Sequence, residues 1–177
     1  MKKIVMMLLA TFMLAACGDN EDAPKELSPE EAEKIIEDGT VGYEIVDGTY
    51  TEADNVSEEL EKELLDAFDY YLTAFNEKDI NKFKEILAVE AEGFNYDEEI
   101  EYVKNVFEQY SSISRISEEA YVIKYIENKE AHLLSNMSVS MVEKDTKNTL
   151  EWLERTVMVF ILEGGQWKLS SVHAKQI

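Results

Sequence analysis

Residues 155–177 read RTVMVFILEGGQWKLSSVHAKQI and predict two long antiparallel strands joined by a tight turn. Gly164 and Gly165 tolerate the positive φ angles of a two-residue hairpin, so strands are expected over 149–163 and 166–175. Strands usually span about 3–10 residues, and longer ones bend strongly or contain bulges. The chain is therefore predicted to end in a strongly curved β-hairpin.

The pattern before this hairpin changes once, near Tyr110. After it, side chains alternate with a period of two, which predicts further strands over 113–117, 121–128 and 131–143. Before it, apolar residues recur at helical spacing. Helices are expected from an N-cap at Ser57 for about five turns, then over 80–87, and then over about 97–110. Helices followed by a curled antiparallel sheet define an α+β fold with three N-terminal helices packed on a strongly curved antiparallel sheet.

Two stretches resemble the nuclear transport factor 2-like superfamily. FDYYLTAFNEKDINKFKEIL (residues 68–87) resembles its opening pair of helices, with an aromatic-lined first helix and a KD break. Residues 155–177 resemble its closing hairpin, in which a glycine turn leads into a Trp-x-hydrophobic strand that ends near a histidine. The resemblance covers about residues 57–177 and implies a cone-like fold with a pocket between the helices and the sheet. It does not select a function, because the superfamily includes isomerases, dehydratases, hydrolases, ligand binders and protein-interaction modules.

The N-terminus has the layout of a secretory signal. Lys2 and Lys3 precede an uncharged apolar run that is too short to span a membrane. The run ends in Leu-Ala-Ala-Cys, which resembles the lipobox of bacterial lipoproteins, and Cys17 is the only cysteine of the chain. An ordinary cleavage site with an incidental cysteine is the alternative, but it does not explain why the cysteine stands at this position. Residues 1–16 are therefore predicted to be a lipoprotein signal peptide, and Cys17 the lipid attachment site.

Three segments follow the signal. Residues 17–34 are acidic, contain both prolines and almost no large apolar side chain, and are predicted to be a flexible tether. Residues 35–56 form an N-terminal extension whose structure the sequence leaves open, although 41–50 (VGYEIVDGTY) alternate enough for a short strand. Residues 57–177 are the cone-like domain. The net charge of −21 becomes −23 without the two signal lysines, which excludes nucleic acid as a partner.

Alternation along the last strands predicts which side chains face the pocket. Trp167 and His173 are expected on one face of the final strand, and Met137 on the apolar face of the strand over 131–143, from which His132 points outward. With two aromatic residues of the first helix, these define the predicted ligand-binding set: Tyr71, Phe75, Met137, Trp167 and His173.

The same residues are the candidates for catalysis. His173 is the candidate base, and Tyr71 or Tyr125 the candidate hydrogen-bond donor. No acidic residue is found on an expected inward face, so these side chains are interpreted as core aromatics and a solvated strand end, and no catalytic residue is assigned. No metal site or cofactor is expected, since phosphate-binding and zinc motifs are absent and the two histidines lie 41 residues apart.

These observations predict a lipoprotein anchored to the bacterial cell membrane through Cys17 and facing outside the cytoplasm. Its domain is expected to be a non-catalytic binding module for a small apolar ligand or a cell-envelope protein; a small hydrolase or isomerase acting in the cone is the alternative. The strand over 149–163 is apolar on both faces. The face away from the helices is therefore expected to form a homodimer or to be covered by residues 41–50, with the dimer favoured.

Overall fold

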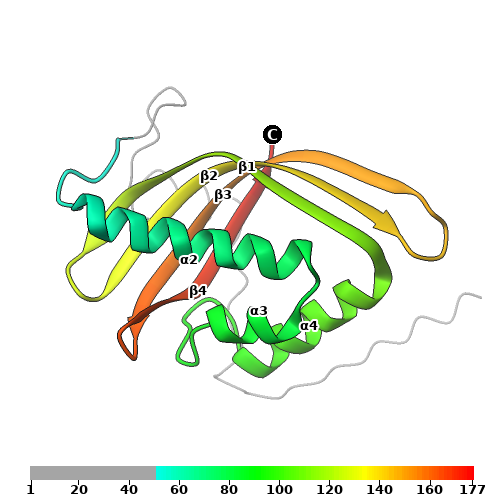
Figure 1. Cartoon of the computed structure of the whole chain (residues 1–177), viewed down its shortest axis with the longest axis horizontal. Helices are drawn as coiled ribbons and strands as arrows, with labels where there is room; N and C mark the ends of the chain where they lie inside the picture. Colours follow the sequence, from blue (N-terminus) through cyan, green and yellow to red (C-terminus); the bar gives the residue numbers. More distant parts are fainter. Residues whose placement is uncertain (1–50) are drawn as a thin grey trace, which may run out of the picture. The chain divides into compact units, whose positions relative to one another are not determined.

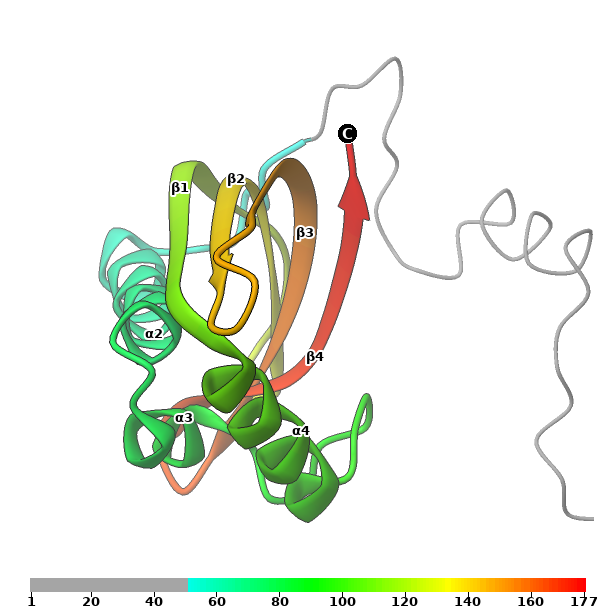
Figure 2. The ribbon, with the colours of Figure 1, turned by 90° about the vertical axis from the view of Figure 1, so that its right-hand side faces the viewer.

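A computed structural model describes residues 51–177 of the chain. This part contains α2 (Glu58–Asn76), α3 (Ile80–Ile86), α4 (Tyr96–Gln109), β1 (Tyr110–Ile126), β2 (Glu130–Glu143), β3 (Thr149–Glu163) and β4 (Gln166–Gln176). The strands form one antiparallel sheet in the order β1-β2-β3-β4. The sheet curls, and α2 crosses one side of it above α3 and α4 (Figures 1 and 2). The expected α+β fold, with three helices on a curved antiparallel sheet, is confirmed.

The helices agree closely with the sequence because each begins at a capping side chain. Ser57 Oγ accepts a hydrogen bond from the backbone N–H of Leu60 at 3.2 Å, as expected for the N-cap of α2. Asp79 and Asn95 cap α3 and α4 in the same way. The bounds of α3 and α4 lie within one residue of those predicted from helical periodicity.

One prediction about the strands is wrong. The segments 113–117 and 121–128, expected as separate strands, belong to the single strand β1. Its pairing with β2 shifts register at three places, between Tyr110 and Ser112, Ser117 and Glu119, and Val122 and Lys124. A bulge absorbs an extra residue without ending the strand, so the interruption of the alternation between the two segments reflects a register shift within one strand. The expectation of bulged strands is confirmed.

The two faces of the sheet have different surroundings. Its inner face packs with the helices in one core cluster, in which Phe68, Phe83, Leu133 and Phe160 are at most 1% exposed. Its outer face has a separate small cluster of Ile123, Leu134 and Val157. His132 pairs with Val159 on the outer face, so the prediction that it points away from the pocket is confirmed, although the residue is buried.

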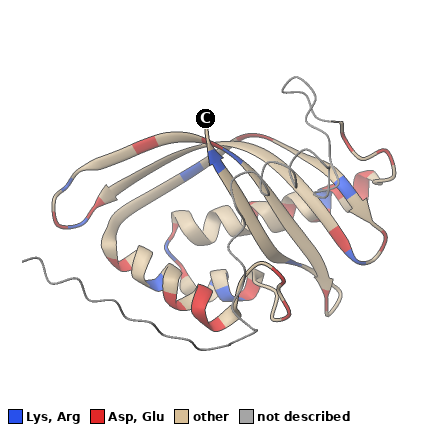
Figure 3. Cartoon of the chain, turned by 180° about the vertical axis from the view of Figure 1, so that it is seen from behind, with Lys and Arg blue, Asp and Glu red and all other residues tan. Residues whose placement is uncertain are grey.

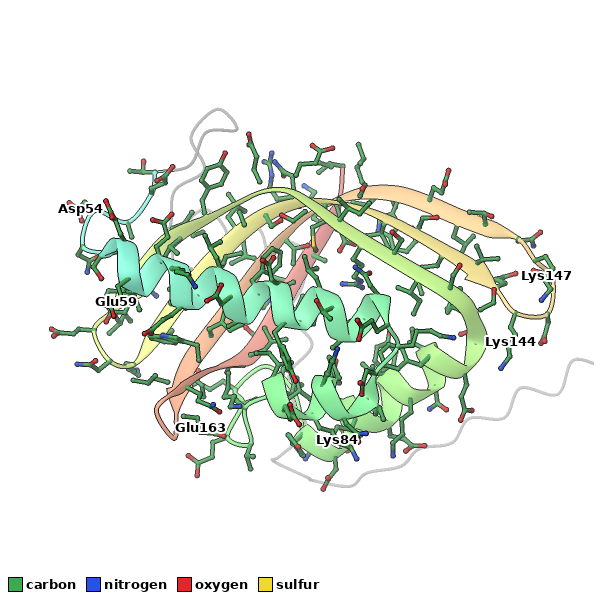
Figure 4. All side chains as sticks on the ribbon, in the orientation of Figure 1. Asp54, Glu59, Lys84, Lys144, Lys147 and Glu163 are labelled. Carbon is green, nitrogen blue, oxygen red and sulfur yellow. The ribbon has the colours of Figure 1, made fainter. Side chains whose placement is uncertain are left out.

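The end of the sheet at the β3–β4 turn is hydrogen-bonded to the loop between α3 and α4. Lys144 and Lys147 lie at the β2–β3 turn and Glu163 lies at the opposite end, beside the β3–β4 turn (Figure 4). The Glu163 carboxylate accepts hydrogen bonds from the backbone N–H groups of Val89 at 3.0 Å and Glu90 at 3.2 Å. This carboxylate therefore joins the final hairpin to the loop between α3 and α4.

Several predictions lie outside the described residues. These are the signal peptide over 1–16, the lipid attachment site Cys17, the tether over 17–34 and the strand candidate within 41–50. Of the extension over 35–56, the structure describes the last six residues. Within residues 51–177, no helix has the length and apolar character needed to cross a membrane.

Candidate functional site

A cavity of 530 Å³ lies between α4, the C-terminal half of α2 and the inner face of the sheet. Its wall combines apolar side chains with a few polar ones. The polar and aromatic lining residues are Tyr71, Phe75, Phe83, Glu99, Tyr102, Gln109, Tyr110, Arg115, Trp152 and Glu154. Its volume falls in the range of about 300–1,000 Å³ that is usual for small-molecule sites.

Arg115 is the cation of this cavity. Its Nη1 donates a hydrogen bond to the Tyr71 hydroxyl at 3.0 Å and lies 3.8 Å from Glu154 Oε1. The guanidinium carbon lies 4.5 Å from the centre of the Phe75 ring, which is a cation–π arrangement. Arg115 Nε is buried and has no hydrogen-bond partner among the described residues. A buried N–H without a partner is costly, so a ligand acceptor that reached this donor would remove that cost.

The backbone of Arg115 is held by the last residue of α2. Asn76 Oδ1 accepts a hydrogen bond from Arg115 N at 2.7 Å, and Asn76 Nδ2 donates one to Arg115 O at 3.0 Å. The turn after α2 is held as well, since Lys78 Nζ donates to the carbonyls of Phe107 at 3.1 Å and Tyr110 at 2.7 Å. The guanidinium is thus positioned from a strand and a helix end rather than from a loop.

Glu154 is the buried acid of the site, and its residue is 6% exposed. It accepts hydrogen bonds from Trp152 Nε1 at 2.8 Å and from Thr156 Oγ1 at 3.4 Å. Sequence reasoning missed this residue. The pattern could have revealed it, because Glu154 lies an even number of residues from Phe160, whose side chain is in the core, and residues two apart share a face.

Two further groups of the cavity wall have perturbed protonation. Burial raises the pKa of the Glu99 carboxyl above its usual value. Burial also raises the pKa of the Tyr71 hydroxyl, although the nearby charge of Arg115 acts in the opposite direction. Both groups therefore favour their neutral forms more than the same groups in water do. The Tyr71 hydroxyl keeps its proton at neutral pH and can donate it to a ligand atom.

The predicted ligand-binding residues do not all lie at this cavity. Tyr71 and Phe75 line it, with their ring centroids 5.0 Å apart. Met137 is 1% exposed within the core and is not a lining residue. Trp167 lies at a different hollow, between α2 and the β3–β4 turn, where its ring centroid is 6.3 Å from that of Tyr125.

The expectation that Trp167 and His173 share a face is wrong. Trp167 pairs with Leu162 on the inner face, whereas His173 pairs with Val157 on the outer face. The register shifts between these pairs, because Ser170 has no partner on β3. One extra residue moves the following side chains to the opposite face. His173 therefore points away from the cavity, and the sequence proposal of a His173 base acting there is wrong.

The bulge in β4 has a physical cause. The carbonyl oxygens of Leu169 and Ser170 accept hydrogen bonds from the backbone N–H groups of Ala88 at 2.9 Å and Gly93 at 3.1 Å. A Cβ on Gly93 would lie 2.2 Å from Ser171 Cβ, so only glycine fits at this crossing. The loop between α3 and α4 thus pairs with the edge of β4 where the register shifts, and no local pattern in β4 reveals this contact.

Residues 51–177 contain no group of three or more histidine, cysteine, aspartate or glutamate side chains arranged to hold a metal ion. The polar groups of the cavity can instead do three things. Arg115 and Tyr71 can donate hydrogen bonds, Glu99 can hold or release a proton, and the aromatic wall can pack against a flat apolar molecule.

Comparisons with known proteins support the fold alone. No protein-family model and no curated protein sequence matches the chain. A solved structure of a proposed aromatic ring hydroxylase from Novosphingobium aromaticivorans superposes with a TM-score of 0.65 at 16% identity, covering 70% of this chain and 92% of that one. A nuclear transport factor 2-like superfamily protein from Salmonella enterica serovar Typhimurium gives 0.59 at 14% identity, with coverages of 65% and 89%.

A third structure is a hexachlorocyclohexane dehydrochlorinase from Novosphingobium barchaimii. It superposes with a TM-score of 0.57 at 10% identity, covering 65% of this chain and 84% of that one. Together with the three helices on an open, curved four-stranded sheet, these likenesses show that the chain has the nuclear transport factor 2-like fold. The resemblance noted in the sequence is confirmed at the level of fold.

Proposed function

We propose that this chain is a membrane-anchored extracytoplasmic lipoprotein whose cavity binds a small, neutral, largely apolar molecule with one hydrogen-bond acceptor. The observation that carries the ligand assignment is the buried Arg115 Nε, which has no partner among the described residues. Arg115 lines a cavity whose wall is mainly aromatic and aliphatic side chains. An acceptor on the ligand would satisfy this donor, while the rest of the ligand packs on the apolar wall.

The charges of the site favour a neutral ligand over an anion. Glu154 lies 3.8 Å from Arg115 and balances its charge inside the cavity. The whole chain has a net charge of −21, which repels anions at a distance. Arg115 would therefore act through the direction of its N–H bond rather than through an excess positive charge.

Equilibrium dialysis with two matched probes tests this proposal. 2-Acetylnaphthalene has a carbonyl acceptor, and 2-isopropylnaphthalene has nearly the same shape without it. We expect the wild type to bind the ketone about tenfold more tightly, the effect of one hydrogen bond to a charged donor. Arg115→Lys keeps the positive charge but replaces the fixed Nε–H donor with an ammonium on a flexible stem, so the preference should largely disappear.

Arg155→Lys is the matched control. Arg155 lies on β3 and its Nε donates to Asn136 Oδ1 at 3.0 Å, away from the cavity. The control should keep the preference for the ketone. Equal binding of the two probes by the wild type, or a preference that survives Arg115→Lys, would contradict the ligand assignment.

A small hydrolase or isomerase acting in the same cavity is the second candidate. It is favoured by Glu99, a partly buried carboxyl with a raised pKa on the cavity wall, since a general acid or base works best with a pKa near the working pH. The likeness in fold to a hexachlorocyclohexane dehydrochlorinase is compatible with this role. Binding remains the leading proposal because the bonds of Glu154 go to Trp152, Thr156 and Arg115 rather than to a tyrosine of the cavity.

Native mass spectrometry of the protein purified from its own host separates the two candidates. A binding module should retain the same bound mass in the wild type and in Glu99→Gln. An enzyme should retain a substrate in Glu99→Gln that is absent or altered in the wild type. The two outcomes differ in which molecule is retained, so neither depends on knowing the ligand beforehand.

The anchoring part of the proposal is supported by the Leu-Ala-Ala-Cys sequence that ends the apolar N-terminal run. A diacylglycerol on Cys17 would provide two acyl chains, and stable attachment requires more than one. Cys17→Ser should move the protein from the membrane fraction to the soluble fraction. A variant that still sediments with membranes and is released by detergent would refute the lipid assignment.

A further inference from the structure

The outer face of the sheet is buried in one half and exposed in the other. In the half near the β1–β2 turn, Leu134 is 2% exposed, Val157 6% and Ile123 7%. Further along the same face, Ile116 is 58% exposed and Leu153 50%. The pairings confirm that these residues share one face, since Ile116 and Leu153 both pair with Ser138, four residues from Leu134 on β2.

The helices do not explain this difference. The buried residues of α2, α3 and α4 belong to the cluster on the inner face, whereas the outer cluster contains strand residues alone among the described ones. From behind, the strands lie in front of the helices, and most of the strand positions are neither acidic nor basic (Figure 3). Within residues 51–177, the partly buried apolar side chain that packs on this outer cluster is Tyr121. The near half of this face is therefore an apolar surface on which no described helix packs.

The described chain begins beside that half. Ala53 N donates a hydrogen bond to Val122 O at 2.9 Å, and Asn55 Nδ2 donates to Tyr125 O at 3.4 Å. Both bonds are made to the free edge of β1, next to Ile123 of the outer cluster. The residues that precede Ala53 thus approach the sheet where the buried half begins.

The sequence just before this point has the chemistry of a cover. Residues 41–46 read VGYEIV, and alternation puts Val41, Tyr43 and Ile45 on one face. Ala53 lies eight positions after Ile45, and an extended chain of eight residues spans roughly 26 Å. Crossing from β1 to β3 requires about 10 Å, so the connection is long enough.

We propose that residues 41–46 lie across the outer face of β1, β2 and β3 and cover Ile123, Leu134 and Val157. A second copy of the chain fits the observations less well. The segment that follows residues 41–46 is already bonded to the edge of β1 beside this half, whereas a second copy would have to be held there by other contacts.

Thiol labelling of the full chain tests this cover. Leu134→Cys introduces a reporter under the proposed segment, and Ile116→Cys introduces a matched reporter on the uncovered half of the same face. A maleimide is added, and labelling is measured on the peptide that contains the reporter, so Cys17 does not interfere. We expect the reporter at 134 to react at least about tenfold more slowly than the one at 116.

Replacing Val41, Tyr43 and Ile45 by serine should then accelerate labelling at 134 to within about threefold of the rate at 116. Labelling at 116 should not change. Equal rates at the two reporters before this replacement, or slow labelling at 134 after it, would overturn the proposal. Protection at 134 that disappears on dilution, with a dimer seen by sedimentation, would also overturn it in favour of a second copy.

A second measurement avoids any folding defect of the Leu134→Cys chain. Benzoylphenylalanine in place of Tyr43 keeps an aromatic side chain and forms a covalent bond to its neighbours on illumination. The expected crosslink joins residue 43 to peptides containing Ile123, Leu134 or Val157 within one chain. Crosslinks only between two chains, or only to the helices, would overturn the proposal.

Discussion

Replacing Glu154 with glutamine removes the negative charge beside Arg115 with little change in shape. The side chain of Glu154 is 8% exposed and that of Arg115 17% exposed, and the ion pair is 3.8 Å long. At an effective dielectric constant of about 20, the attraction at this distance is about 4 kcal/mol. Most of that attraction is offset by the removal of both groups from water, so the intact pair adds little net stability.

Removing one partner of this ion pair should lower the free energy of unfolding by more than the intact pair contributes to it. Arg115 would keep its charge in a cavity where its remaining neighbours are the Tyr71 hydroxyl and the Phe75 ring. The loss of one member of a buried pair destabilises proteins by about 3–5 kcal/mol. Since Arg115 is partly exposed, we expect Glu154→Gln to lower the free energy of unfolding by about 3 kcal/mol.

Urea unfolding followed by far-ultraviolet circular dichroism measures this change. Adding Arg115→Met to Glu154→Gln removes the unpaired charge and should restore about 2 kcal/mol. Glu151→Gln is the control on the same strand, where the side chain is exposed, and should change stability by less than about 0.5 kcal/mol. A loss below about 1 kcal/mol for Glu154→Gln, or additive effects in the double variant, would show that solvent screens the pair as it screens a surface pair.

Three other predictions concern single residues. Because burial raises the pKa of Glu99, the folded chain holds this proton more tightly than the unfolded chain. The free energy of unfolding should therefore fall as the pH rises past about 4.5. In urea titrations between about pH 4 and 7, the stability of Glu99→Gln should rise relative to that of the wild type. Burial lowers the pKa of His132, although its hydrogen bond to Glu130 opposes this shift. The free energy of unfolding should therefore fall as the pH drops through about 6.5. If the difference in stability between the wild type and His132→Asn does not change over that pH range, this prediction is wrong. Gly93→Ala would place a Cβ 2.2 Å from Ser171 Cβ and should cost about 1–3 kcal/mol, whereas Glu92→Ala should be nearly neutral; equal melting temperatures for the two would contradict the close crossing.

The helices could be predicted from the sequence because their information is local. Side chains three and four residues apart define the buried stripe of a helix, and Ser57, Asp79 and Asn95 mark where each one begins. The glycine turn between β3 and β4 is equally local, since Gly164 and Gly165 both adopt the positive φ angles expected of them. These features identify the α+β class and the order of its elements.

The faces of the strands could be predicted only where no bulge intervenes. On β2 and β3, unbroken pairing places Met137 and Met158 in the core as alternation requires. On β4, the register shift at Ser170 moves His173 to the outer face. The cause is a contact with Gly93, which is 77 residues away in the sequence. A pattern confined to one strand cannot contain that information.

The candidate site likewise contains residues that a local pattern identifies and one residue whose position depends on contacts distant in the sequence. Tyr71 and Phe75 were identified because they belong to a helical stripe. Arg115 was missed because it lies in a mostly polar stretch of β1, and its position in the cavity depends on Asn76, Tyr71 and Glu154, all distant in the sequence.

The apolar character of the cavity could therefore be read from the sequence, whereas the polar groups that would select its ligand could not. The wall depends on repeated positions along α2 and α4, and each of those positions is specified by its own periodicity. The donor that would orient a ligand is one guanidinium, fixed by a helix end, a phenol and a carboxylate from three different elements. A substitution on the wall should thus change how tightly apolar molecules bind, while a substitution at Arg115 should change which of them is preferred.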